Sequence, residues 1–373
     1  MEKATRDWFT INKVQALDTP AFVVYPARVL HNIEQAKRII GDVSRLRPHV
    51  KTHKSPDVTL MLLQAGIKKF KCATIAEAEM LAQCKAPDVL LAYQPVGPKI
   101  DRLLQLVKNY PETTFSCLVD NSKSAEEIAA AALNSDIDLN VYIDLNVGMN
   151  RTGIAPGKEA LQFYLNCLTK LGIRPVGLHA YDGHIHDADL SVRESRSDGV
   201  YNLVSQLKQD LIAAGIEEPQ IIIGGSPTFL LYAKRADVEC SPGTFVYWDA
   251  NYQRSYPEQP FLPAALVITR VVSKPAPTLL CLDLGHKAVA AENSLDKRVS
   301  FLNAPNVKII SQSEEHIVID AGENHSYEVG DLFYGLPYHI CPTCALYERA
   351  ITIENEEITG EWLTIARNRK INF

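Results

Sequence analysis

Two hydrophobic patterns alternate along residues 18–245 of this chain. Short runs of β-branched and aromatic residues, such as TFSCLV from Thr114, are typical of buried strands. The longer stretches between them, such as 99–108 and 122–133, place apolar residues at the spacing of one helix face. A regular alternation of strand and helix predicts parallel βα units.

The number of units favours a closed barrel. Eight strand–helix units within about 215 residues match the size of a (β/α)8 barrel. An open, doubly wound sheet is the alternative, but it usually has fewer strands, and no GxGxxG motif follows the first strand here. The predicted strands are AFVVY from Ala21, RLRPHVKT from Arg45, KFKCAT from Lys69, DVLLAY from Asp88, TFSCLV from Thr114, LNVYIDLN from Leu139, RPVGLHAYDG from Arg174 and QIIIGGS from Gln220.

After about Thr244 the pattern changes. Segments such as NVKIISQSEEHIVID, from Asn306, are typical of strands joined by turns, and long helical stretches disappear. We therefore predict a barrel domain over residues 18–245 and an all-β domain over residues 246–373. Residues 1–17 precede the first predicted barrel strand, so we assign them to the β-domain.

The composition and charge of the chain disfavour some classes of function. The 373 residues are 46% hydrophobic and 22% charged, and the net charge is −6, so a nucleic-acid or membrane-surface binder with a basic face is disfavoured. The start of the chain lacks the apolar core of a signal peptide, and no run approaches the ~20 apolar residues of a membrane span. Eight scattered cysteines, mostly in apolar segments, favour reduced thiols and a cytoplasmic location.

The segment RPHVKTHK, Arg47 to Lys54, concentrates basic side chains in a mildly acidic chain. Alternate residues of a barrel strand face the lumen, so His49, Lys51 and His53 share the inward face. Lys51 then lies at the carboxyl end of its strand, where barrel enzymes carry their chemistry. Nearby cations lower the pKa of a lysine and free its amine to attack a carbonyl, as Schiff-base chemistry requires. The alternative is a structural lysine with an acidic partner.

The motifs LDTPAFVVY, RPHVKTHKSP and CATIAEAE resemble the fold-type III pyridoxal-phosphate (PLP) enzymes, the alanine-racemase-like group. Within that group the chain is most similar to the D-threonine aldolase / D-serine dehydratase family. The resemblance covers almost the whole chain, and it implies that Lys51 carries PLP as a Schiff base. We place His49, which shares the inward face, among the cofactor-binding residues. The resemblance also implies a barrel followed by a β-domain, and a homodimer.

Two glycine-containing segments are candidates for the cofactor phosphate. IIIGGSPTF, from Ile221, runs from a strand through two glycines into a short helix. Glycines let the backbone approach an anion, and phosphate sites commonly follow the last strands of a barrel. SPGTF, from Ser241, is a second small, polar segment. In similar enzymes these segments hold the phosphate, which implies roles for Gly225, Ser226, Gly243 and Thr244.

Two further motifs follow the sixth and seventh predicted strands. VGMNRTG lacks the GK[ST] ending of a P-loop, and by its position alone Arg151 would be a surface or helix-capping residue. In the similar family the RTG arginine lies beside the phenolic oxygen of the cofactor, and a fixed cation there stabilises the phenolate. The resemblance also places Tyr181, the tyrosine of AYxG, near the pyridine nitrogen. His184 is a candidate general base near the substrate.

YHICPTC, from Tyr338, predicts a strand on which His339 and Cys341 share a face. Imidazole and thiolate form a zinc-like pair, although the spacing alone fits two buried residues equally well. Cys341 and Cys344 form a CxxC that lacks the second CxxC of a four-cysteine zinc site and the context of a redox motif. The resemblance implies that His339 and Cys341 hold a divalent metal, zinc or manganese, that binds the β-hydroxyl of the substrate.

Together these features predict a PLP- and metal-dependent lyase that acts on small D-3-hydroxy amino acids. Retro-aldol cleavage of D-threonine into glycine and an aldehyde is favoured. Dehydration of D-serine or 3-hydroxyaspartate to a keto acid and ammonia is the alternative. An amino-acid racemase needs no metal, and a non-catalytic PLP-binding protein needs no β-domain, so both fit the sequence less well.

Overall fold

The computed structural model describes residues 7–373, and its internal contacts divide the chain into two compact units. The barrel unit comprises Glu34–Lys51, Val58–Phe245 and Asn368–Phe373. The β-unit comprises 7–33, Thr52–Asp57 and Val246–Arg367. The chain therefore passes from the barrel unit to the β-unit directly after Lys51.

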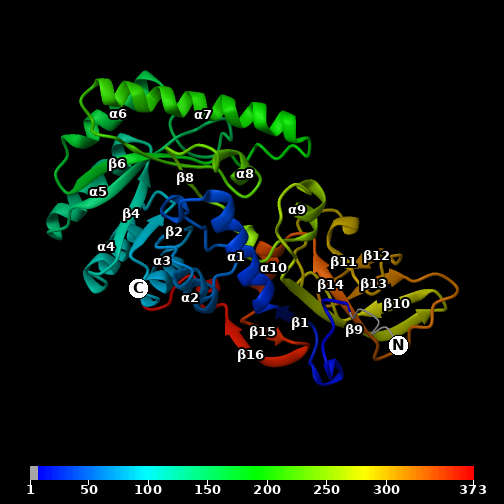
Figure 1. Cartoon of the computed structure of the whole chain (residues 1–373). Coiled ribbons are helices and arrows are strands. Elements are labelled where there is room, and N and C mark those ends of the chain that lie inside the picture. Colours follow the sequence, from blue (N-terminus) through cyan, green and yellow to red (C-terminus); the bar gives the residue numbers. More distant parts are fainter. Residues whose placement is uncertain (1–6) are drawn as a thin grey trace. The chain divides into compact units, whose positions relative to one another are not determined.

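Seven parallel strands form the sheet of the barrel unit, and each pairs with its neighbours in the sequence (Figure 1). These strands are β2 (Lys69–Cys72), β3 (Asp88–Leu91), β4 (Thr114–Val119), β5 (Leu139–Asp144), β6 (Ile173–Ala180), β7 (Gln220–Ile223) and β8 (Glu239–Cys240). Most of their residues are buried on both faces, as in other all-parallel sheets. The predicted parallel sheet of a βα barrel is confirmed.

An irregular segment, residues 46–50, joins the two edge strands of this sheet. Single parallel bridges connect Leu46 with Cys240 of β8 and His49 with Lys71 of β2. The amide of Lys71 donates a hydrogen bond to the carbonyl of Pro48 at 2.8 Å. Because proline has no amide hydrogen, Pro48 cannot take part fully in a ladder. Eight chain segments thus encircle the barrel, seven as regular strands.

One strand assigned to the barrel from sequence is wrong. AFVVY forms β1 (Ala21–Val24), which pairs with β9 (Ala265–Ala276) and β15 (Arg349–Glu354) in the β-unit. The barrel is completed instead by β8, whose two residues are too short to give a pattern. All four residues of β1 are buried, so no alternation distinguishes a strand of one sheet from a strand of the other.

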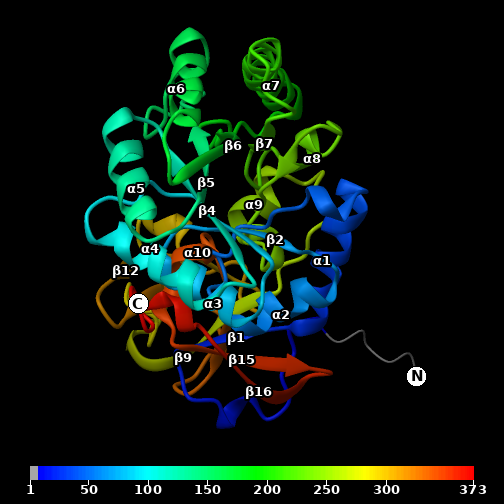
Figure 2. The same ribbon diagram turned by 90° about the vertical axis from the view of Figure 1, so that its left-hand side faces the viewer.

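Helices follow the barrel strands, and α4 to α7 lie on the outer side of the sheet (Figure 2). Capping side chains fix the start of several helices. Thr74 accepts a hydrogen bond from the amide of Glu77 at the start of α3, and Asn121 accepts one from the amide of Ser124 at the start of α5. The helices are α1 (Pro26–Ile40), α2 (Pro56–Gln64), α3 (Ile75–Gln83), α4 (Pro98–Asn109), α5 (Ser122–Asn134), α6 (Lys158–Leu168), α7 (Leu190–Ala213) and α8 (Phe229–Tyr232).

The barrel interior is layered from the amino to the carboxyl ends of its strands. The first is an ionic layer, in which buried Arg47 donates to Glu239 at 2.7 Å and to Asp88 at 2.5 and 3.1 Å, while Lys69 also contacts Glu239. An apolar layer follows, made of Leu90, Leu118, Tyr142 and Ile222. Polar residues of β2, β5 and β6 come next, near the carboxyl ends. Water-excluding packing therefore separates the ionic layer from the end of the barrel where chemistry is expected.

Nine strands form the sheet of the β-unit, in the order β12-β13-β10-β9-β1-β15-β16, with β14 paired to β9 and β11. Besides β1, β9 and β15, its strands are β10 (Leu279–Leu282), β11 (Val299–Phe301), β12 (Lys308–Gln312), β13 (Ile317–Asp320), β14 (Leu332–Pro337) and β16 (Glu357–Leu363). Two short helices, α9 (Ala250–Ser255) and α10 (Ile340–Leu346), interrupt the strands. Its core includes Val23, Leu266 and Ile268.

Two further expectations concern the whole chain. All eight cysteines are free thiols, and five of them are buried. Across residues 7–373, each helix is too short or too polar to cross a membrane, including α7, which is the longest at 24 residues.

Candidate active site

Three cationic side chains surround the ring of Tyr181 at the carboxyl end of the barrel. The Lys51 ammonium lies 5.5 Å from the ring centroid, the Lys71 ammonium 5.7 Å and the Arg151 guanidinium 5.1 Å. Tyr181 follows β6, and Arg151 lies in the loop after β5. Aromatic rings attract cations over their faces, and this ring draws together residues from three separate motifs. The predicted neighbours Lys51, Arg151 and Tyr181 are therefore close in space.

His49 lies beside Lys51 as the alternation of the segment predicts. It is 8% exposed, and its Nδ1 accepts a hydrogen bond from the amide of Lys51 at 3.3 Å. His53, which the same alternation placed on the inward face, belongs instead to the β-unit, because the chain leaves the barrel after Lys51. Its Nδ1 accepts from the amide of Ser55. The alternation therefore ends at Lys51, where the strand-like segment also ends.

The two predicted phosphate segments meet through a serine hydroxyl. Ser226 Oγ accepts the amides of Gly243 at 3.2 Å and Thr244 at 3.1 Å. Ser241 Oγ, in the same loop, is buried and has no hydrogen-bond partner in residues 7–373. A Cβ atom on Gly225 would approach the ring of Tyr181 to 3.1 Å, so this backbone lies close under the ring. An unpaired buried hydroxyl, in a loop where Ser226 already gathers two backbone amides, suits a phosphate, so these residues fit the phosphate end of PLP.

An aspartate that sequence reasoning missed fixes this loop. Asp182 follows Tyr181 and is buried, and it accepts hydrogen bonds from Thr228 Oγ1 at 3.2 Å and from the Tyr232 hydroxyl at 2.9 Å. Thr228 in turn accepts the amide of Gly225 at 3.3 Å. Burial raises the pKa of Asp182 to about 6, although these hydrogen bonds oppose the rise. In the sequence, the aspartate of the AYDG motif was the feature that could have indicated this role.

A lysine that sequence reasoning also missed lies within the barrel. Lys71, on β2, is 2% exposed, and its Nζ is 3.5 Å from Nε2 of His179 on β6. His179 Nδ1 is 2.7 Å from Asp144 Oδ1 at the end of β5. The available signal was KFKC, in which two lysines alternate with buried apolar residues. The three side chains form a buried series from a carboxylate through an imidazole to an amine.

His184 lies against the loop that carries Arg151. A Cβ atom on Gly148 would come within 2.7 Å of His184 Nε2, so the loop passes directly over the imidazole. Burial, with Arg196 and His186 nearby, lowers the pKa of His184, and its Nδ1 is buried with no hydrogen-bond partner in residues 7–373. A neutral imidazole with an unpaired nitrogen is suited to accept a proton, and its role as a base stays a prediction.

The predicted metal pair lies in the β-unit at a strand-to-helix turn. His339 caps the start of α10 and Cys341 is in its first turn, so the expectation that both lie on a strand is wrong. The turn nevertheless brings imidazole and thiol into hydrogen-bonding contact. Burial alone would lower the pKa of His339, but Cys341 and Glu292 raise it to about 9. Despite burial, His339 lowers the pKa of the Cys341 thiol.

Hydrogen bonds orient both members of this pair. Glu292 Oε1 lies 2.5 Å from His339 Nδ1, and this hydrogen bond orients the imidazole. Thr52 Oγ1 lies 3.2 Å from Cys341 Sγ, and Thr52 is the residue that follows Lys51 in the chain. An oriented imidazole beside a readily ionised thiol fits a divalent metal in donor type. Within residues 7–373, no group of three or more histidine, cysteine, aspartate or glutamate side chains is arranged to hold a metal ion.

Cys344 does not extend the pair. Its thiol donates to the carbonyl of His53 at 3.4 Å, and burial raises its pKa to about 12. A thiol that stays protonated is a poor metal ligand and a poor redox group. The CxxC spacing therefore reflects packing of α10.

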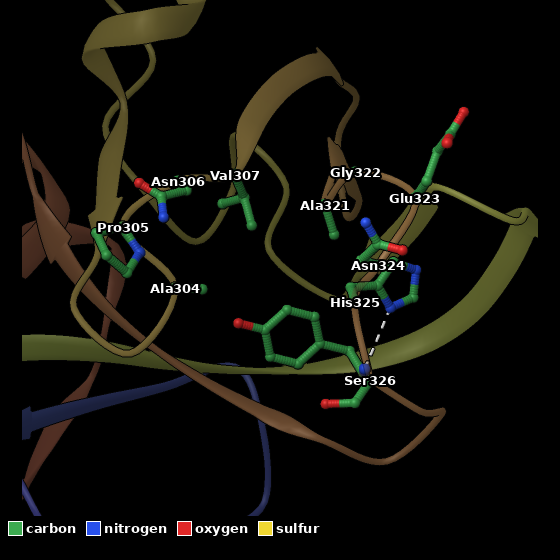
Figure 3. Close-up of a pocket in the computed structure, with 11 residues that line it drawn as sticks. Ala304, Pro305, Asn306, Val307, Ala321, Gly322, Glu323, Asn324, His325 and Ser326 are labelled. Carbon is green, nitrogen blue, oxygen red and sulfur yellow. Dashed lines mark hydrogen bonds between the residues drawn. The ribbon is translucent and has the colours of Figure 1, made fainter.

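A cavity of about 490 Å³ elsewhere in the β-unit contains none of the predicted site residues (Figure 3). It is lined by residues 304–307 and 321–327. In Figure 3 the imidazole of His325 points back to its own chain, where Nδ1 accepts the amide of Tyr327 at 3.1 Å. This histidine is occupied by local hydrogen bonds, so the cavity offers no comparable chemistry.

The family can now be assigned. Residues 24–251 match the profile of the alanine racemase N-terminal domain, and residues 264–353 match a putative serine dehydratase domain. The chain belongs to the alanine racemase N-terminal domain family. The predicted resemblance to D-threonine aldolases and D-serine dehydratases is confirmed, and with it the prediction of a PLP enzyme of the lyase group.

Individual relatives span nearly the whole chain. A 3-hydroxy-D-aspartate aldolase of Paracoccus denitrificans (strain Pd 1222) is 26% identical, over 91% of this chain and 90% of its own length. A D-threonine aldolase of an Arthrobacter species is 26% identical, over 94% and 93%. The crystal structure of D-threonine aldolase from Filomicrobium marinum has a TM-score of 0.88 at 24% identity and covers 95% of this chain and 97% of its own, which confirms the fold.

Proposed function

We propose that the protein is a PLP- and divalent-metal-dependent lyase that cleaves D-3-hydroxy amino acids, with D-threonine as the favoured substrate. The observation that carries the proposal is the hydrogen bond between Thr52 and Cys341. It ties an imidazole–thiol pair to the residue that follows the predicted cofactor lysine. A metal-binding pair next to a Schiff-base lysine in the chain is what a metal-assisted reaction of an amino acid requires.

The barrel residues would hold the cofactor. Lys51 would carry it, Ser226 with the amides of Gly243 and Thr244 would face its phosphate, and Arg151 would face its phenolic oxygen. PLP, when bound, supplies an electron sink for the bonds at the α-carbon of an amino acid. The protein's contribution is to position the ring, and the close approach of Gly225 to Tyr181 leaves no room for a larger side chain at this position.

The pair in the β-unit would hold the metal. A zinc or manganese ion there supplies a Lewis acid for the β-hydroxyl of the substrate. Glu292 keeps His339 turned toward Cys341, and Thr52 stabilises the thiolate. Two protein ligands leave coordination positions for water and substrate, as catalytic sites require.

Two relatives that span more than nine-tenths of the chain are aldolases of D-3-hydroxy amino acids, which supports cleavage of the Cα–Cβ bond. Dehydration is the second candidate. It is supported by the match of residues 264–353 to a putative serine dehydratase domain and by the thiol at the metal position, which favours zinc. The two reactions differ in the bond that breaks, and both use the same residues.

A product assay separates the two reactions. The protein with PLP and added zinc or manganese would be given D-threonine and D-serine separately. Glycine and an aldehyde from D-threonine, abolished by EDTA, support the aldolase. A keto acid and ammonia support the dehydratase. Turnover that is unchanged by EDTA and by Cys341→Ala would refute a role for the metal pair.

We also propose that the protein acts as a homodimer in the cytoplasm. The eight free cysteines support a reducing compartment, and the family resemblance supports the dimer. Light scattering during size-exclusion chromatography, with and without PLP, measures the number of chains directly. A single chain at micromolar concentration would refute the dimer.

A further inference from the structure

Lys71 is a buried amine that has no role in the function proposed above. A lysine is rarely buried without a carboxylate partner, yet Lys71 Nζ makes its side-chain hydrogen bond to an imidazole nitrogen, His179 Nε2, at 3.5 Å. Its strand lies next to segment 46–50, since Lys71 bridges to His49. Lys71 and Lys51 therefore lie on adjacent segments, and both ammonium groups are over the ring of Tyr181.

Asp144 determines the protonation of His179. The Asp144 carboxylate is 2.7 Å from His179 Nδ1, so the ring proton lies on Nδ1 and Nε2 presents a lone pair. Gln94 donates to the second oxygen of Asp144 at 2.9 Å, and despite burial His179 lowers the pKa of this carboxyl. Burial lowers the pKa of His179 itself. The imidazole therefore accepts one hydrogen of Lys71 and leaves the amine lone pair directed elsewhere.

Charged groups of both signs surround Lys71. Lys51 and Arg47 come from the neighbouring segment, Asp144 from β5, Asp182 from the turn after β6, and Arg151 from the loop after β5. The carboxylates are already engaged, Asp144 by His179 and Asp182 by Tyr232. Burial, and then repulsion by Lys51, lower the pKa of Lys71 to about 7. An amine of this kind is substantially unprotonated at neutral pH.

We propose that Lys71 is a catalytic base, which takes up the proton that the substrate's α-ammonium group releases when its nitrogen becomes a nucleophile. His179 and Asp144 act as positioning residues for this amine. In the step, an N–H bond of the substrate breaks and its electron pair stays on the substrate nitrogen, while the lone pair of Lys71 Nζ forms a new N–H bond. The proton returns when the product leaves. This inference rests on the proposed function, because it requires an amino-acid substrate.

This arrangement suits general acid–base catalysis in a buried site. An amino acid arrives protonated at neutral pH, and its nitrogen cannot attack until the proton has been accepted. A base with a pKa near the working pH accepts and returns a proton with little energetic loss. Lys51 would be bonded to the cofactor and could not accept this proton at the same time. Lys71, on the adjacent strand, accepts it instead.

The first test uses cofactor-free protein and needs no activity. NMR of protein with ¹³C-labelled lysine follows each Cε signal with pH, and Lys71→Arg identifies the signal of Lys71. We expect a midpoint near 7 that moves to higher pH in Lys51→Met, because a repelling charge is removed. Lys69→Met, on the same strand and face, is the matched control and should leave the midpoint unchanged. A midpoint above about 10, the ordinary range for lysine, would overturn the proposal.

The second test compares variants of the PLP-loaded enzyme. Lys71→Met should lower kcat about 100-fold or more, the usual effect of losing a general base. Lys71→Arg should not restore it, because a guanidinium stays protonated. If Lys71 were only a structural cation, Lys71→Arg would be close to wild type, and that result would overturn the proposal. His179→Gln should shift the acidic limb of the kcat profile while Lys71 remains.

The two proposals fail in different ways. Absence of turnover with every D-3-hydroxy amino acid would refute the proposed function, whereas the Lys71 midpoint in cofactor-free protein would be unaffected. A lyase that works normally in Lys71→Met would refute the catalytic base and leave the proposed function standing.

Discussion

Replacing Arg47 with methionine tests the ionic layer of the barrel. The Arg47 side chain is fully buried, and it holds Glu239, whose side chain is 10% exposed, and Asp88, whose side chain is 31% exposed. Removing one partner of a buried ion pair costs about 3–5 kcal/mol, because the other charge is left unpaired in a poor solvent. Asp88 reaches water and Lys69 still contacts Glu239. We therefore expect a loss of about 3 kcal/mol, the lower end of that range.

Urea unfolding of cofactor-free protein, followed by circular dichroism, measures this loss. Adding Asp88→Asn to Arg47→Met should recover part of the stability, because Asp88 is the carboxylate that loses its ion-pair partner when Arg47 is removed. Arg174→Met, on the exposed side of β6, is a matched control and should have no measurable effect. A loss below about 1 kcal/mol for Arg47→Met, or a double variant less stable than the single one, would show that the ionic layer does not contribute as we reason.

Three further predictions concern the site. Gly225→Val should weaken PLP binding at least about 10-fold, because the new Cβ would lie 3.1 Å from the ring of Tyr181. Fluorescence titration measures the affinity, and an unchanged value would contradict the predicted position of the cofactor. Cys341→Ser should lower zinc affinity, measured by competition with a chelator, about 10-fold or more, and equal affinity would exclude the thiol as a ligand. Stability should fall as pH rises from about 4 to 6, because burial raises the pKa of Asp182 to about 6 and the folded state then binds more protons than the unfolded state. Asp182→Asn should reduce this fall in urea unfolding at pH 4.5 and 6.5, and an unaltered slope would assign it to other groups.

Strand periodicity predicted most of the barrel. Six of the predicted strands coincide with β2 to β7, and Lys51 lies over the ring of Tyr181, as the inward alternation predicts. The assignment of β1 failed because four buried residues have the same pattern in a parallel barrel and in the middle of a mixed sheet. Which partners a fully buried strand chooses depends on residues more than 200 positions away, and local pattern does not contain that information.

Candidate site residues could be proposed from the sequence where a motif was contiguous. The phosphate segments and the imidazole–thiol pair were each visible within a few letters, although the geometry of the pair comes from a helix start rather than a strand. Lys71, His179 and Asp144 lie on three different strands, so only the register of the sheet brings them together. Taken singly, none of these three residues stands out in the sequence. Lys71 was therefore not predicted as a site residue.

The irregular segment 46–50 also determines which pieces of the chain can exist alone. A fragment of residues 58–245 contains all seven regular strands, yet it lacks the segment that bridges β2 and β8. It also lacks Asn372, whose amide and side chain donate to Glu79 of α3. Such a fragment would expose two open strand edges, which recruit other chains into aggregates. During synthesis segment 46–50 can bridge β2 as soon as β2 is made, whereas its bridge to Cys240 must wait for β8, so we expect the barrel to close only after residue 240 has been added.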